Sequence, residues 1–341
     1  MKLTLYKKKL IVLLMGYGDY VHWTAVIRDL YYEVNSRDKN DVHNYIVGLC
    51  KKVHQQCNNE KIQIDYGITN IKKTSNSHNF KFYVDIRWKG NIFSHEQAKV
   101  IFKNNSMVTN DNSYPNLIYL TIKSDGYLER GPGGNIVKLY DNKHVVDTYA
   151  KNLGLEKYNK KGYFHFTDDE YNKVKKNLPS KKFILVEPQN HKNLESRLLS
   201  FDFMQNLVNK IKETNDIEIV QISPSKFADK ESQYLDNCIV FKDVFTYREA
   251  ILFGKHAEFA IVPHGGLSIG LAALDTKVIA IYPCIHRVPM TTYETEIAME
   301  ISDGNHYLCF LNKCEKCNQL RNKFNSSEFN NIINKSNEIL N

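Results

Sequence analysis

The stretch 258-EFAIVPHGGLSIGLAALDTKVIAIYP-283 contains two apolar runs of strand length, separated by a glycine pair and a helix-like segment. We expect strands at Glu258 to Val262 and at Val278 to Tyr282, as at Leu10 to Met15, whose continuous apolar run is the pattern of a strand buried on both faces of a parallel sheet. From Leu267 onward the residues favour a helix. A strand, a helix and a second strand in this order predict an α/β fold with a parallel sheet.

The segment 14-LMGYGDYVHWTAVIRDL-30 predicts another unit of this kind. The apolar run Leu10 to Met15 has strand length, Gly16 and Gly18 favour a tight turn, and from Tyr20 the apolar residues recur at helical spacing. Along the rest of the chain we expect helices at Asp41–Gln56, His144–Leu153, Phe201–Lys212, Tyr247–Phe253 and Ser326–Leu340, and strands at Ile62–Ile68, Lys81–Arg87, Phe183–Val186 and Ile217–Ile222.

A Lys-rich, glycine-containing stretch separates two halves that both show this alternation. We place a first α/β domain at residues 1–160, a linker region at 161–181 and a second α/β domain at 182–341. Within the linker, Thr167 and Glu170 have the spacing of a helix capping box, an interpretation that we prefer to a metal-binding acidic cluster. The last helix either caps the second domain or crosses back to the first.

The composition is that of a folded soluble protein, with 42% hydrophobic and 25% charged residues. The formal net charge is +8, but only 8 of the 46 basic residues are Arg and they are spread along the chain, so we expect no nucleic-acid partner. Seven Cys without a framework spacing favour reduced thiols, and the run Leu10 to Met15 is too short for a signal core or a membrane span. We therefore expect a cytoplasmic protein, with peripheral contact to an anionic membrane left open.

A group of possible metal ligands lies near the end of the chain. It combines a His-x2-Cys pair and a Cys-x2-Cys pair, which is a spacing found in structural zinc sites, in the residues His306, Cys309, Cys314 and Cys317. The alternative, which we prefer, is a set of ordinary thiols. We expect no catalytic metal and no required cofactor.

Two strand-to-helix turns are the candidate sites. In an open α/β sheet, ligands collect beyond the carboxyl ends of the strands, next to helix N-termini. Gly265 and Gly266 would let the backbone approach an anion, and Ser268 would add a donor, although a tight connection without a ligand has the same pattern. The turn at Gly16 and Gly18 lacks the full dinucleotide fingerprint, and no Walker or HExxH sequence is present.

These two turns and their flanking segments resemble the heptosyltransferase-like glycosyltransferases of family 9. The pair Gly18-Asp19 is similar to the Gly-Asp pair that ends the family's first strand. The segments 143-KHVVDTYAKNLGL-155, 184-ILVEPQNHKNLESRLLSFDFMQNLVNKIK-212 and 244-VFTYREAILFGKHAEFAIVPHGGLSIGLAALDTKVIAIYP-283 resemble the end of its first domain and much of its donor domain. The resemblance implies two Rossmann-like domains that face each other across a cleft, the GT-B architecture.

The resemblance also implies roles for particular residues. Asp19 would be the general base of an inverting transfer from a nucleotide-diphosphate sugar to a glycan or glycolipid, although an Asp at this place is also a common helix N-cap. Gly16, Gly18 and His22 would lie on the acceptor side of the site, whereas a solvent-facing place is expected for Arg28. The donor would be held by Arg197, Ser223, Lys226, His264, Gly265, Gly266, Leu267 and Ser268. The alternatives are a surface position for Arg197, ordinary loop positions for Ser223 and Lys226, and a buried, hydrogen-bonded ring for His264.

The sequence departs from the family pattern at the second turn. His264 and Gly265 stand where the family has Asp and Thr, and Ile269 stands where it has His, so the donor's sugar and base stay open. The alternatives are another GT-B activity, such as a fucosyltransferase-like transfer or nucleotide-sugar epimerisation, and a non-catalytic protein that binds nucleotide sugars or glycans.

Overall fold

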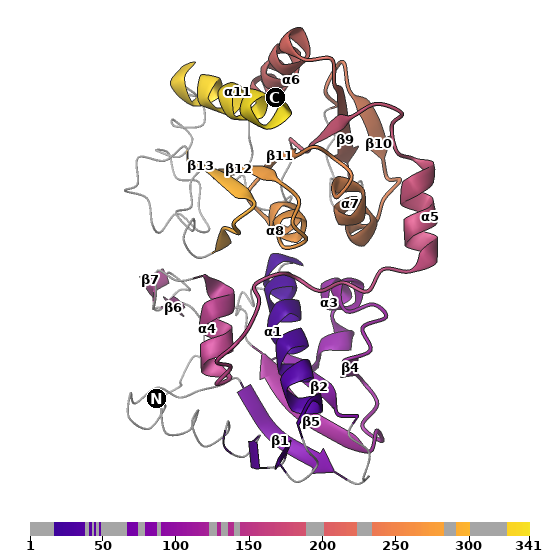
Figure 1. Ribbon diagram of the computed structural model, residues 1–341, viewed down its shortest axis with the longest axis vertical. Helices are drawn as coiled ribbons and strands as arrows, with labels where there is room; N and C mark the ends of the chain where they lie inside the picture. Colours follow the sequence, from indigo (N-terminus) through magenta and orange to yellow (C-terminus); the bar gives the residue numbers. More distant parts are fainter. Residues whose placement is uncertain are drawn as a thin grey trace, which may run out of the picture.

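The computed structural model describes residues 17–37, 41–42, 44–45, 48, 67–73, 79–86, 90–122, 128–130, 136–139, 144–188, 201–223, 234–282, 291–300 and 326–341. The described chain forms two lobes, joined by a connecting segment of residues 153–167 that runs between them (Figure 1). The predicted strand Leu10 to Met15 lies outside the described residues. None of the described helices is long and apolar enough to cross a bilayer.

The first lobe is a mixed sheet with helices. Its elements are α1 (Tyr17–Asn35), β1 (Gly67–Lys73), β2 (Lys81–Ile86), β3 (Gly90–Asn91), the 3-10 helix η1 (Ile92–Ser94), α3 (Glu96–Ile101), β4 (Val108–Thr109), β5 (Asn116–Ile122), β6 (Leu128–Arg130), β7 (Ile136–Leu139) and α4 (Val145–Asn152). The main sheet has the order β1-β5-β2-β3, with β4 on β2, while β6 and β7 form a separate antiparallel pair.

Parallel and antiparallel pairs coexist in this main sheet. Strand β2 is parallel to β4 and β5, as the alternation of strands and helices predicts, but β1 and β3 are antiparallel to their neighbours. The reason is the length of the connections. Only seven residues separate β1 from β2 and only three separate β2 from β3, whereas a parallel crossover needs roughly a dozen or more. Of the predicted helix at 41–56, residues 41, 42, 44, 45 and 48 are described and all are helical.

The second lobe is a six-stranded sheet in which every pair of neighbouring strands is parallel. Its elements are α5 (Asp168–Lys176), β8 (Phe183–Val186), α6 (Phe201–Thr214), β9 (Glu218–Ser223), β10 (Ile239–Lys242), α7 (Tyr247–Gly254), β11 (Ala260–Pro263), α8 (Gly266–Ala272), β12 (Val278–Tyr282), β13 (Glu296–Glu300) and α11 (Ser326–Leu340). From the central β8, the strands β9 and β10 follow on one side and β11, β12 and β13 on the other. This is the strand order of dinucleotide-binding Rossmann folds, and its switch point lies between β8 and β11.

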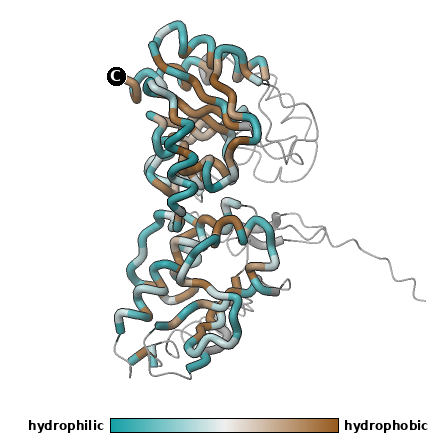
Figure 2. The backbone as a smooth tube through the Cα atoms, turned by 90° about the vertical axis from the view of Figure 1, so that its right-hand side faces the viewer, coloured by the Kyte–Doolittle hydropathy of each residue, from teal (hydrophilic) through white to brown (hydrophobic). Residues whose placement is uncertain are grey.

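Both faces of this sheet are covered. On one face, Ile184, Ile261 and Ile279 pack against α6 and α11, with Ile332 and Ile333 of α11 in the same cluster. Helix α11 therefore caps the second lobe, which is the first of the two positions expected for it (Figure 1). Figure 2 shows the hydrophobic strands inside this lobe and more hydrophilic helices around them.

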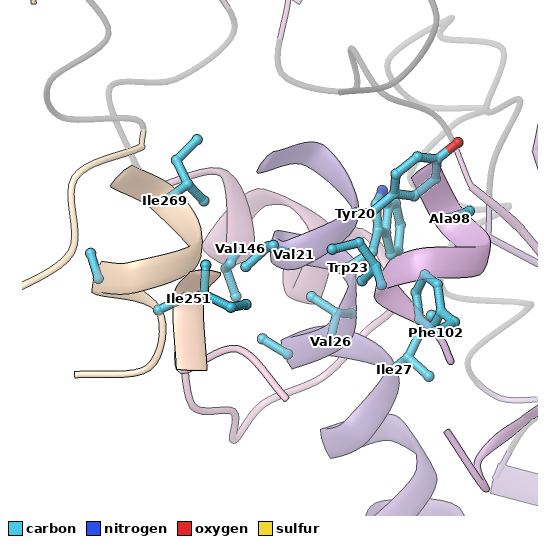
Figure 3. Close-up of a cluster of buried hydrophobic side chains, with 14 of the residues drawn as sticks. Tyr20, Val21, Trp23, Val26, Ile27, Ala98, Phe102, Val146, Ile251 and Ile269 are labelled. Carbon is cyan, nitrogen blue, oxygen red and sulfur yellow. The ribbon is translucent and has the colours of Figure 1, made fainter. Parts of the chain in front are cut away.

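The other face of the sheet belongs to a core that continues into the first lobe. Val262 and Ala280 of the sheet, Ile251 of α7 and Ile269 of α8 lie in one buried cluster with Val21 and other α1 residues. Figure 3 shows Val21 and Val146 of the first lobe beside Ile251 and Ile269 of the second. The lobes thus share an apolar contact through α1, α7 and α8, which fixes where the two candidate turns meet.

Candidate functional site

The two segments singled out from the sequence lie against each other, but Gly18 and Asp19 already belong to helix α1, which begins at Tyr17 and not at Tyr20 as the apolar spacing predicted. A Cβ atom added at Gly18 would lie 2.6 Å from Ile269 Cδ1 of α8, and a Cβ added at Gly266 would lie 3.0 Å from Tyr17 Cβ of α1. Both distances are too short for ordinary packing. Glycine at the two positions therefore allows the N-terminal ends of α1 and α8 to touch.

The turn at Gly265 connects β11 to α8 at the switch point of the sheet. Its φ angle of 172° is extended backbone, and Ser268 closes the turn. Ser268 Oγ accepts a hydrogen bond from the Gly265 N–H and donates one to the Gly265 carbonyl, each at 3.0 Å. Ser268 is fully buried, whereas Gly266 and Leu267 are partly exposed. The Ser268 hydroxyl thus shapes the turn from within, and the outer backbone of the turn is what a ligand could reach.

Asp19 is the third residue of α1 and lies within its first turn, past the N-cap position. It is partly buried. Burial, and in second place the negative charge of Asp19, raise the pKa of the neighbouring Tyr20. A carboxylate in the first turn is favoured by the helix dipole, so Asp19 has a stabilising role there whatever else it does.

His264 packs inside the second lobe. Its ring stacks on Tyr282 with centroids 4.1 Å apart, its Nε2 is 3.3 Å from Thr291 Oγ1, and its Nδ1 is 3.7 Å from Glu296 Oε1. The side chain of Glu296 is fully buried and accepts a hydrogen bond from Tyr282 Oη at 2.8 Å. Both ring nitrogens of His264 thus face side chains of its own lobe, which agrees with the buried interpretation of this residue.

His22 lies in the contact between the lobes rather than on an open surface. It is 2% exposed, and its Nδ1 is hydrogen-bonded to Tyr293 Oη of the second lobe at 2.8 Å. His144, the N-cap of α4, packs edge-on against both rings. Burial, with a smaller effect of the positive charge of Lys160, lowers the pKa of His144 to about 4, so its ring is neutral at pH 7. This ring cluster joins the two lobes beside the candidate site.

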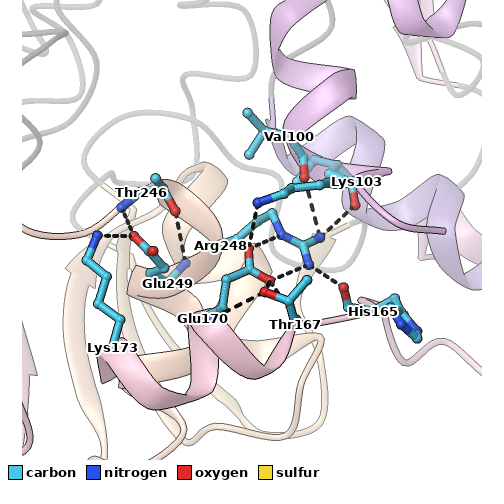
Figure 4. A network of polar contacts seen from close by, with 10 residues as sticks. Val100, Lys103, His165, Thr167, Glu170, Lys173, Thr246, Arg248 and Glu249 are labelled. Carbon is cyan, nitrogen blue, oxygen red and sulfur yellow. Dashed lines mark hydrogen bonds and ion pairs between the residues drawn. The ribbon is translucent and has the colours of Figure 1, made fainter. Parts of the chain in front are cut away.

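Arg248 joins the lobes on another side, where it also forms a buried ion pair inside the second lobe (Figure 4). Arg248 of α7 is 1% exposed and donates to both carboxylate oxygens of Glu170, at 2.8 and 3.0 Å. Its other N–H groups donate to the backbone carbonyls of Ile101 in α3 and His165 in the connecting segment. The capping box of Thr167 and Glu170 is present as predicted, but the role of Arg248 was not foreseen. The sequence feature that could have indicated this role is an Arg within the otherwise mostly apolar helix segment YREAILFG.

Of the remaining candidates, Arg28 is described, Ser223 is described without its side chain, and the others lie outside the described residues. Arg28 donates hydrogen bonds to the carbonyls of Asn159 and Lys161, so it anchors the connecting segment to α1. Ser223 ends β9, and its side chain is not described. The candidates outside the described residues are Gly16, Arg197, Lys226, His306, Cys309, Cys314 and Cys317. Within the described part of the chain, no group of three or more His, Cys, Asp or Glu side chains is arranged to hold a metal ion.

Comparison with known proteins gives matches only at the level of structure. No family model and no curated protein matches the sequence. Similar solved structures are a glycosyl transferase family 9 protein of Veillonella parvula (10% identity, TM-score 0.40), ADP-heptose LPS heptosyltransferase II of E. coli (13%, 0.39) and the iron-containing dodecameric glycosyltransferase TibC of enterotoxigenic E. coli (12%, 0.47).

These matches are partial. They cover 55%, 52% and 66% of this chain, and 61%, 53% and 61% of the respective proteins, so this chain spans less than two thirds of the length of each. At such identities the likeness concerns the fold alone. The three proteins are glycosyltransferases by description.

Proposed function

We propose that this chain is a glycosyltransferase that moves a sugar from a nucleotide-diphosphate donor to a glycan or glycolipid acceptor. The observation that carries the proposal is the contact between the Gly18-Asp19 turn and the Gly265-Gly266 turn. The second turn lies at the switch point of a sheet with Rossmann strand order, where ligands of such sheets bind. Asp19 follows Gly18 directly in the first turn of α1, next to this contact.

The proposed reaction uses the two turns for different tasks. Asp19 takes the proton from an acceptor hydroxyl as the oxygen of that hydroxyl bonds to the anomeric carbon of the donor. The bond from the anomeric carbon to the diphosphate breaks, and its electron pair stays on the phosphate oxygen. Attack from the side opposite the leaving group inverts the configuration at the anomeric carbon. The first domain, residues 1–160, would then carry the acceptor, and the second, residues 182–341, the donor.

The departing diphosphate gains negative charge, which needs stabilisation. Backbone N–H groups at the partly exposed Gly266 and Leu267 lie at the N-terminal end of α8, where a helix carries partial positive charge. Arg197 and Lys226 are the proposed cationic contacts. Ser223 ends β9, the strand next to β8, which supports a contact to the nucleoside. The His264 ring stacks on Tyr282, so His264 would not contact the diphosphate through a ring nitrogen. Its role would be to hold the neighbouring Gly265-Gly266 turn in place.

A panel of nucleotides and nucleotide sugars tests the proposal. A nucleoside diphosphate that binds the folded chain at 100 times its Kd should stabilise it by about 2.7 kcal/mol, which appears as a rise in Tm. The matching nucleoside without phosphates is the control and should give a smaller rise, because the turn contacts the diphosphate. Release of the diphosphate from at least one nucleotide sugar is expected. Binding without any release would favour the non-catalytic alternative, and no rise in Tm with any nucleotide would refute the donor site.

A further inference from the structure

Two tyrosines hold the candidate turns together. Tyr17 is the first residue of α1 and Tyr247 is the first residue of α7, and their rings stack in parallel with centroids 4.1 Å apart and planes 7° apart. Tyr247 Oη donates a hydrogen bond of 2.5 Å to the carbonyl of Gly266 in α8. The pair therefore connects three helix ends, and two of these belong to the proposed site.

Helix α8 has a glycine face that receives this pair. Gly266 and Gly270 are four residues apart, so they lie on the same side of the helix. A Cβ at Gly266 would lie 3.0 Å from Tyr17 Cβ, and a Cβ at Gly270 would lie 2.5 Å from Tyr247 Oη. Any larger residue at either position would push a tyrosine away. The two glycines of the segment GLSIG in α8 thus leave the space that the two tyrosines occupy, which indicates close packing between α1, α7 and α8.

We propose that Tyr247, acting through its stack on Tyr17, is a positioning residue that sets the place of Asp19 relative to the Gly265-Gly266 turn. The inference rests on the function proposed above. Asp19 lies two residues after Tyr17 in the first turn of α1, so a shift of the α1 backbone at Tyr17, which contacts Gly266, would shift Asp19 as well. A misplacement of about 1 Å between reacting groups costs roughly a hundredfold in rate.

The chemistry of the pair suits a fixed contact. Burial raises the pKa of both Tyr17 and Tyr247, with smaller effects of the charges of Glu96 on Tyr17 and of Tyr17 on Tyr247, so both hydroxyls keep their protons near neutral pH. Tyr247 therefore stays a hydrogen-bond donor to Gly266. The stack needs no ionisation, so it should hold over the whole pH range in which the protein is folded.

Steady-state kinetics of four variants tests the inference. Tyr247→Leu and Tyr17→Leu each remove the stack, and each should lower kcat at least tenfold while the affinity for the donor's nucleoside diphosphate changes less than twofold. The double variant should lose no more than either single variant, because both remove the same contact. Tyr247→Phe keeps the stack and loses only the hydrogen bond, so kcat should recover to within about fivefold of the wild-type value.

Phe164→Leu is the matched control, because Phe164 and Phe166 also form a stacked pair, with centroids 5.6 Å apart, in the connecting segment. It should lower Tm and leave kcat within twofold. Equal losses of kcat in the control and in Tyr247→Leu would overturn the inference, as would multiplicative effects of Tyr17→Leu and Tyr247→Leu. If Tyr247→Leu does not fold, Tyr17→Leu and Tyr247→Phe still decide the question. A wild-type protein that uses no donor would refute the proposed function and this role together, whereas an active wild type with unchanged Tyr247 variants would refute only the role.

Discussion

Replacement of Arg248 by Met tests how much the buried ion pair between Arg248 and Glu170 contributes to the free energy of unfolding. Arg248 is 1% exposed, and the side chain of its partner Glu170 is 5% exposed, so neither charge is well solvated. Arg248→Met leaves the Glu170 carboxylate buried, and among the described residues its remaining ion-pair partner is Lys103, whose Nζ lies 3.8 Å from Glu170 Oε1. Loss of one member of a buried pair typically costs about 3–5 kcal/mol. For lobes of this size, that corresponds to a fall in Tm on the order of 10 °C.

The assay is equilibrium unfolding by urea, followed by far-UV circular dichroism. Lys181→Met is the control, because Lys181 and Asp216 form an exposed ion pair at 3.0 Å, and its loss should leave the midpoint of urea unfolding nearly unchanged. Arg248→Met combined with Glu170→Gln should be less destabilised than the sum of the single variants, because the second change removes the uncompensated charge. A loss below about 1 kcal/mol for Arg248→Met would refute the reasoning.

Two further predictions concern other contacts of the lobes. His144→Asn keeps a helix N-cap and removes a titrating ring. Because the pKa of His144 in the folded protein, about 4, lies below the ordinary 6.5, the free energy of unfolding of the wild type should fall as the pH drops from 6.5 to 4, by up to about 1.4 kcal/mol per pH unit. Unfolding curves of the variant measured across this range should lack that contribution. An unchanged pH profile would contradict the prediction. Gly18→Ala should cost about 1–3 kcal/mol through its clash with Ile269 Cδ1, and Ile269→Val should recover part of this loss in thermal unfolding, whereas additive losses would show that the close approach is not the cause.

The second lobe was largely predictable because its central strands are short apolar runs. β8 and β12 are buried along their whole length, and their predicted bounds match those in the structure. β10 and β13 were missed for physical reasons. β10 is only partly buried, so it lacks a continuous apolar run, and β13 begins and ends with Glu. In the first lobe, β1 and β3 are antiparallel to their neighbours because the connections to β2 are short, and the alternation of strands and helices in the sequence does not reveal this.

The candidate site could be predicted only as two separate turns. That Gly18 meets Ile269 and Gly266 meets Tyr17 depends on tertiary packing between segments that are 249 to 251 residues apart in the sequence. The same holds for Arg248, whose partners lie 78 to 148 residues away in the chain. His264 and His22 illustrate the converse. Each has a residue type that suggests a ligand contact, but burial against Tyr282 and Tyr293 decides what the rings touch.

The most direct test of the proposed function measures transfer by Asp19→Asn with the donor identified in the nucleotide panel. Glu33→Gln removes a carboxylate from the same helix away from the turns, and it serves as the control. The account predicts that Asp19→Asn loses about a hundredfold or more in kcat, with the rise in Tm by nucleoside diphosphate unchanged, and that Glu33→Gln keeps its activity. Full transfer by Asp19→Asn, or a loss of nucleotide binding equal to the loss of transfer, would contradict a catalytic base at the contact of the two turns.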